Sequence, residues 1–155
     1  MKSLIAFFLV ALSVPALAQT MEARRIKQEM IQRTVDLENH AKEARRLFNE
    51  VKVAEACTQV AYLMRNTPAH ARDVLGRMDM RKRSVRRMQD QAVDMLQIVE
   101  SVHYACRSTD HGDVDPESAA RMMRVYAARM QDHRDGIEDR SVEFSNSYRY
   151  RYDYR

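Results

Sequence analysis

Residues 26–51 read IKQEMIQRTVDLENHAKEARRLFNEV, and the apolar side chains in this stretch recur at intervals of three, four or seven residues. That spacing places them on one face of an α-helix, because the helix completes a turn in about 3.6 residues. The same spacing continues past residue 51, so the sequence predicts one helix over residues 21–66. The positions on its apolar face are Ile26, Met30, Leu37, Ala41, Ala44, Phe48, Val51, Ala54, Cys57, Ala61 and Met64.

Two further helices are predicted after this one, over residues 68–107 and 116–138, each with an apolar stripe of helical spacing. Thr67-Pro68 predicts the break before the second helix, since Pro disfavours the helical conformation in the preceding residue and suits the first helical position. Asp115-Pro116 predicts the start of the third in the same way. The fold class is therefore all-α, as an elongated antiparallel helical hairpin or a three-helix bundle with coiled-coil-like packing.

The composition excludes most other fold classes. Among the 155 residues there are three Gly, three Pro and no Trp, while 45% are hydrophobic and 31% charged. A β-sandwich or barrel needs a turn roughly every 8 to 12 residues, usually built with Gly, Pro, Asn or Asp, and this chain has too few of them. The length fits one domain, which we assign to residues 19–140. With eleven Met in the chain, we expect a core rich in Met and Ala.

Residues 1–18 have the pattern of a secretory signal peptide that is cleaved after Ala18. Lys2 precedes an apolar run from Leu4 to Leu12, and Ala16 and Ala18 supply the small residues of a cleavage site. The run is shorter than the stretch of about 20 residues that a transmembrane helix needs. We therefore expect the mature protein in the periplasm or outside the cell.

The two cysteines, Cys57 and Cys106, leave two topologies open. An exported chain usually joins its cysteines, and a disulfide needs Cα atoms within about 7 Å of each other. A hairpin that turns at Thr67 would set the two cysteines about 44 Å apart along the helix axis. A hairpin that turns near residues 81–84 would place the two cysteines side by side, and Pro68 would then lie inside a long first helix. A disulfide between two chains and free thiols are further alternatives.

Two segments are candidate binding sites. The first, the basic cluster, places five positive charges within seven residues and comprises Arg81, Lys82, Arg83, Arg86 and Arg87. Cationic groups at this density attract phosphate and carboxylate groups. The second is the C-terminal tail, residues 141–155, which we expect to be flexible. Tyr and charged residues alternate there, so that an extended tail would carry its Tyr on one side, able to pair with a sheet edge or stack on rings. The tail residues concerned are Tyr148, Arg149, Tyr150, Arg151, Tyr152 and Tyr154.

No catalytic or metal-binding signature accompanies these segments. The chain lacks Gly-x-Ser-x-Gly, a Gly-rich phosphate loop and Cys-x-x-Cys. Glu100 and His103 have the spacing of a di-iron ligand pair, but no second pair follows. His133 stands alone on the apolar stripe of its helix. We therefore expect no enzymatic activity, no metal site and no cofactor.

The sequence favours an interaction protein: a periplasmic or secreted helical module, chaperone-like or accessory to secretion or envelope assembly. It is expected to bind a protein partner, or a second copy of itself, through Met-rich helix faces or the C-terminal tail. The alternative is a cationic binder of anionic lipid or another polyanion through the basic cluster and the tail. Export argues against nucleic acid as the ligand.

Overall fold

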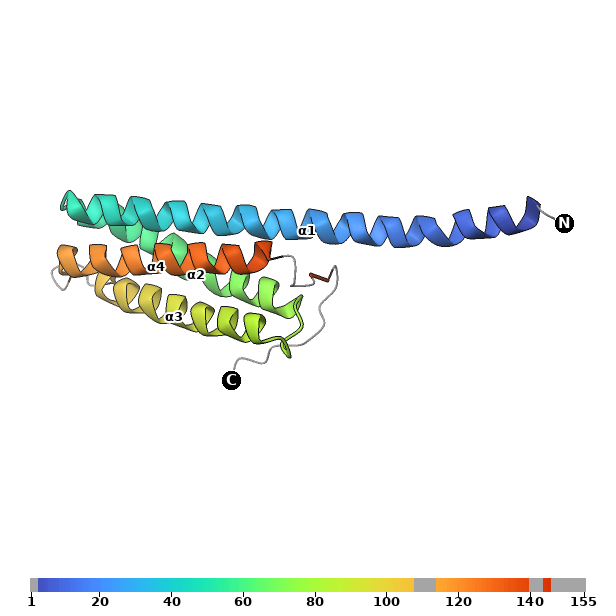
Figure 1. Cartoon of the computed structure of the whole chain (residues 1–155). Helices are drawn as coiled ribbons and strands as arrows, with labels where there is room; N and C mark the ends of the chain where they lie inside the picture. The colour runs from blue at the N-terminus through green and yellow to red at the C-terminus, as the bar shows by residue number, and fades with distance from the viewer. Residues whose placement is uncertain (1–2, 108–113, 140–143, 146–155) are drawn as a thin grey trace.

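The described part of the chain folds as a bundle of four helices (Figure 1). The computed structural model describes residues 3–107, 114–139 and 144–145, with side chains from Thr20 onward. The helices are α1 (Ser3–Asn49), α2 (Val53–Gly76), α3 (Arg83–Cys106) and α4 (Pro116–Glu138), and the described residues contain no strand. The all-α class is confirmed, but the bundle has four helices where a hairpin or three helices were expected.

Consecutive helices run antiparallel, and α1 and α3 each pack against both α2 and α4 (Figure 1). The core between them is rich in methionine, as expected for a chain with few aromatic residues. Six Met are at most 2% exposed: Met30, Met78, Met88, Met95, Met123 and Met130. The N-terminal part of α1 projects past the ends of the other helices, and the core begins at Ile26.

The single helix expected over residues 21–66 is divided by a turn at residues 50–52, so that expectation was wrong. Val51 N donates to the Phe48 carbonyl at 3.0 Å and Lys52 N donates to the Leu47 carbonyl at 2.9 Å. These two bonds form a Schellman motif, which ends a helix with one residue in the left-handed conformation. That residue is normally Gly, but here it is Val51, with φ of 59°. The sequence therefore contains no local signal that predicts this turn.

The turn between the cysteines lies at residues 77–82, close to the second of the two expected positions. The hairpin at Thr67 is wrong, because α2 continues through Pro68. Thr67 does not cap a helix; its hydroxyl donates to the Leu63 carbonyl at 2.7 Å. Because the chain turns after Gly76, Cys57 near the start of α2 lies beside Cys106 at the end of α3. Their sulfur atoms lie at bonding distance, with the Cα atoms 5.5 Å apart.

The bounds of α4 agree with the expected helix over residues 116–138. The Asp115 carboxylate accepts hydrogen bonds from the backbone N–H groups of Glu117 and Ser118 at 3.2 and 3.3 Å, as an N-cap should. Gly136 lies inside the last turn and has no positive φ. A Cβ at this position would come within 2.7 Å of Met88 Sδ, so Gly136 permits the close approach of α3 and α4.

Most of the expected signal segment lies in the projecting part of α1, where side chains are not described. Among the residues that the structure describes, no helix is long and apolar enough to cross a bilayer.

Candidate functional site

The basic cluster lies at the start of α3. Arg81 and Lys82 belong to the preceding turn, and Arg83, Arg86 and Arg87 to α3 itself. The first turn of α3 has no acidic residue, and the N-cap residue Lys82 makes no side-chain capping hydrogen bond. Positive side chains at a helix N-terminus oppose the helix dipole, which favours acidic ones. The start of α3 therefore carries positive charge that its own helix dipole disfavours.

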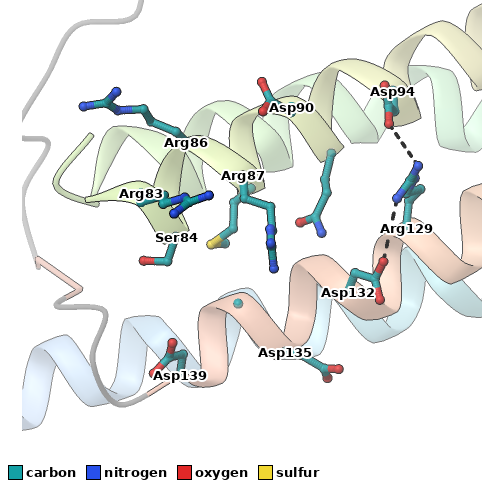
Figure 2. Close-up of a pocket in the computed structure, with 13 residues that line it drawn as sticks. Arg83, Ser84, Arg86, Arg87, Asp90, Asp94, Arg129, Asp132, Asp135 and Asp139 are labelled. Carbon is teal, nitrogen blue, oxygen red and sulfur yellow. Dashed lines mark ion pairs between the residues drawn. The ribbon is translucent and has the colours of Figure 1, made fainter. Parts of the chain in front are cut away.

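The end of α4 carries the opposite charge. The last turn of α4 has no basic residue, and because the two helices are antiparallel, this acidic end lies beside the basic start of α3 (Figure 2). A groove of about 1100 Å³ separates them, and we call it the Arg/Asp groove. On the α3 side the groove is lined by Arg83, Ser84, Arg86, Arg87, Met88, Asp90, Gln91 and Asp94, so that two carboxylates follow the basic cluster. On the α4 side it is lined by Arg129, Asp132, Asp135, Gly136 and Asp139.

Some charges of the groove are paired and others are not. Arg129 bridges the two helices at one end, at 3.4 Å from Asp94 and 4.0 Å from Asp132 (Figure 2). Arg86 turns back and donates to the carbonyls of the 77–82 turn at 3.4 Å. Arg83 and Arg87 make no ion pair with any residue that the structure describes. Arg87 extends from α3 toward α4 (Figure 2), so the groove presents unpaired guanidinium groups.

The C-terminal tail begins at the same end of the bundle. Phe144 packs, half-buried, against the core, and Ser145 N donates to the Arg77 carbonyl at 3.0 Å. Arg77 lies in the turn that leads into the basic cluster, so Phe144 and Ser145, the described part of the tail, lie close to this cluster. Nothing in the sequence indicated this proximity. The tail residues Tyr148, Arg149, Tyr150, Arg151, Tyr152 and Tyr154 themselves lie outside the described residues.

A second polar arrangement is buried in the middle of the bundle, between the diagonally opposite helices α2 and α4. Tyr126 OH and Thr67 Oγ1 are 2.6 Å apart. Because the Thr67 hydroxyl donates its proton to Leu63, the Tyr126 hydroxyl donates to Thr67. Burial raises the pKa of Tyr126, against the opposing effect of its bond to Thr67. This hydrogen bond links α2 and α4 across the core.

His70 of α2 and His133 of α4, the histidine pair, lie in the same buried region. Their ring centres are 5.8 Å apart and the rings meet edge to face. Burial lowers the pKa of His70 to about 3, with His133 and Arg33 adding to the shift. Burial also lowers the pKa of His133 to about 4, although the Met88 backbone opposes this. Both imidazoles are therefore neutral at pH 7. Sequence reasoning missed the pair because its members lie on different helices.

The Met-rich helix faces form the core and are not a surface. The large apolar side chains that are exposed are instead scattered: Met21, Val51, Tyr62, Val93, Tyr104 and Val125. Tyr62 is moreover stacked on His40, with ring centres 3.8 Å apart. The hypothesis that Met-rich faces bind a partner therefore finds no exposed Met stripe among the described residues.

No family model, curated protein or solved structure matches the chain. Within the described part of the chain, no three or more His, Cys, Asp or Glu side chains gather in the manner of a metal site.

Proposed function

We propose that the protein is an exported, non-enzymatic helical interaction protein that binds a segment of a protein partner in the Arg/Asp groove. The observation that carries this proposal is the unpaired state of Arg83 and Arg87, which lie opposite the acidic end of α4. An extended peptide with both acidic and basic side chains can pair with both walls. Each exposed ion pair contributes only about 0.2–1 kcal/mol, so several must form together.

The C-terminal tail is proposed to extend this binding surface. Ser145 is held beside the basic cluster, and Tyr side chains provide apolar area together with a hydroxyl group, a combination enriched in protein interfaces. A chain that ends after Ser145 is expected to keep its helicity by circular dichroism and to bind the partner more weakly. Unchanged binding would exclude the tail from the interface and leave the groove as the only site.

The groove is tested with charge reversal and a matched control. Arg83→Glu with Arg87→Glu removes the unpaired cations, while Arg45→Glu with Arg124→Glu makes the same change in net charge at exposed positions elsewhere. Both variants and the wild type are used for affinity capture from the host's envelope fraction, and captured proteins are quantified by mass spectrometry. A partner that is lost only with the first variant supports the proposal. Equal capture by all three chains contradicts it.

The second candidate function is binding to an anionic lipid surface. It is favoured by the exposure of Arg81, Arg83 and Arg87 at one end of the bundle, and opposed by the Asp side chains across the groove. Co-sedimentation with phosphatidylcholine vesicles, with and without phosphatidylglycerol, distinguishes the two functions. Lipid binding should require the anionic lipid and weaken steeply with salt. Binding of a protein partner should not depend on phosphatidylglycerol.

Export is part of the proposal and rests on the pattern of residues 1–18. A disulfide between Cys57 and Cys106 would persist in an oxidising compartment, which is consistent with it. N-terminal sequencing of the protein from its native host is expected to begin at Gln19. A mature protein that begins at Met1 would contradict this part of the proposal.

A further inference from the structure

The histidine pair has unsatisfied nitrogen atoms. His70 is 4% exposed and His133 is fully buried. His70 Nε2 is paired with the Thr34 hydroxyl at 3.0 Å, and the Met88 backbone interacts with one ring nitrogen of His133. His70 Nδ1 and at least one nitrogen of His133 have no hydrogen-bond partner among the described residues. Buried polar atoms without a partner are rare in native proteins, and a ligand is one of the established reasons for them.

The tautomer of His70 follows from the hydrogen bonds of Thr34. The Thr34 hydroxyl has one proton, which it donates to the Met30 carbonyl at 2.8 Å. Toward His70 it can therefore only accept, so the proton of the neutral imidazole is on Nε2. The lone pair of His70 is then on Nδ1, the nitrogen without a partner. A histidine that binds a metal almost always donates its other N–H in this way, so Thr34 is a positioning residue.

We propose that His70 and His133 bind one soft monovalent metal ion, Cu(I) or its analogue Ag(I), between α2 and α4. An ion bonded to one nitrogen of each ring at about 2 Å separates those nitrogens by at most about 4 Å, which ring centres 5.8 Å apart allow. Zn²⁺ usually takes four ligands from Cys, His, Asp or Glu. No such set gathers among the described residues, which favours an ion that accepts two nitrogen ligands.

The residue that contacts His133 through its backbone, Met88, also carries a thioether. Burial lowers the pKa of His133, and a hydrogen bond with the Met88 backbone raises it. The Met88 side chain lies against Gly136, one turn further along α4. Thioether sulfur binds Cu(I) in preference to the harder divalent ions. The helical spacing of the sequence gave no sign of this site, because its residues come from different helices. The inference is independent of the groove and of the proposed function.

The test is a titration of the folded, disulfide-bonded protein with Ag⁺, followed by calorimetry. One ion per chain is expected. His133→Leu should abolish binding, and Thr34→Val, which keeps both imidazoles but removes the acceptor of the His70 N–H, should weaken it by about tenfold or more. His40→Gln is the matched control, since it removes an imidazole outside the core, and should bind as the wild type does.

A second measurement, made on the wild type, tests the proposal even if a variant fails to fold. Imidazole nitrogen NMR should show that Ag⁺ shifts His70 Nδ1 and one nitrogen of His133, while His70 Nε2 stays protonated. The proposal is overturned if the wild type binds no ion, if Ag⁺ shifts only histidines outside the pair, or if His133→Leu binds normally. Binding of Zn²⁺ as tight as that of Ag⁺ would also overturn it.

Discussion

Acidification from about pH 7 to about pH 5 should destabilise the bundle through the histidine pair. Burial holds the pKa of His70 at about 3 and that of His133 at about 4, whereas a histidine in an unfolded chain has a pKa of about 6.5. Between these values the unfolded chain takes up a proton at each histidine and the folded bundle does not. The stability is therefore fully present above about pH 6.5 and is lost as the pH falls toward the folded pKa values.

The expected loss is large. At about pH 5 each histidine is about 1.5 pH units below its unfolded pKa, which lowers the free energy of unfolding by about 2 kcal/mol per residue. The pair together should lower it by about 4 kcal/mol, out of a total of about 5–15 kcal/mol for a typical domain. This result requires that both folded pKa values lie well below 5. Acidic side chains such as Glu22 and Glu43 have lowered pKa values and titrate below this range.

The assay is urea unfolding followed by circular dichroism at both pH values, with a chelator present so that the imidazoles are metal-free. The double variant His70→Leu/His133→Leu should lose less than about 1 kcal/mol on acidification. His40→Gln, which removes a histidine outside the core, should behave like the wild type. An equal loss in the wild type and the double variant would refute the reasoning, because the pH dependence would then arise from other groups.

Three further predictions concern stability in urea. Replacing Cys57 and Cys106 with Ser opens a link across 49 residues and should cost about 4 kcal/mol; a loss under about 1 kcal/mol would mean that the two thiols do not pair. Val51→Gly should stabilise the protein by about 1 kcal/mol, because the left-handed conformation costs Val about 1–2 kcal/mol. The Val51 side chain is 71% exposed, so its removal loses little packing. A destabilised variant would contradict this. Gly136→Ala should destabilise by about 1–3 kcal/mol despite the better helix former, since the added methyl meets Met88 in the core; unchanged stability would show that Met88 can move aside.

The sequence predicted helices well where a capping signal agreed with an apolar stripe. Asp115-Pro116 gave the start of α4 correctly because the cap is a local hydrogen bond between neighbours. Pro68 is compatible with a turn or with a helix that continues through it, and the tertiary structure shows the latter. The turn at Val51 was missed entirely, since its left-handed residue is not the Gly that such turns normally use.

The candidate sites were predicted only in part. The basic cluster is visible in the sequence because its charges are contiguous, but the Asp side chains that face it come from α4. The sequence also gave no indication that the tail would begin beside the cluster, which depends on the bond between Ser145 and Arg77.

The sequence by itself determined the all-α class, the Met-rich stripes and the two cysteines, because these depend on the spacing of residues along one helix. Only the tertiary structure decided that four helices form, that the basic start of α3 lies beside the acidic end of α4, and that His70 meets His133. These features join residues on different helices. Their proximity follows from where the chain turns, and the turns at residues 50–52 and 77–82 contain neither Gly nor Pro to mark them.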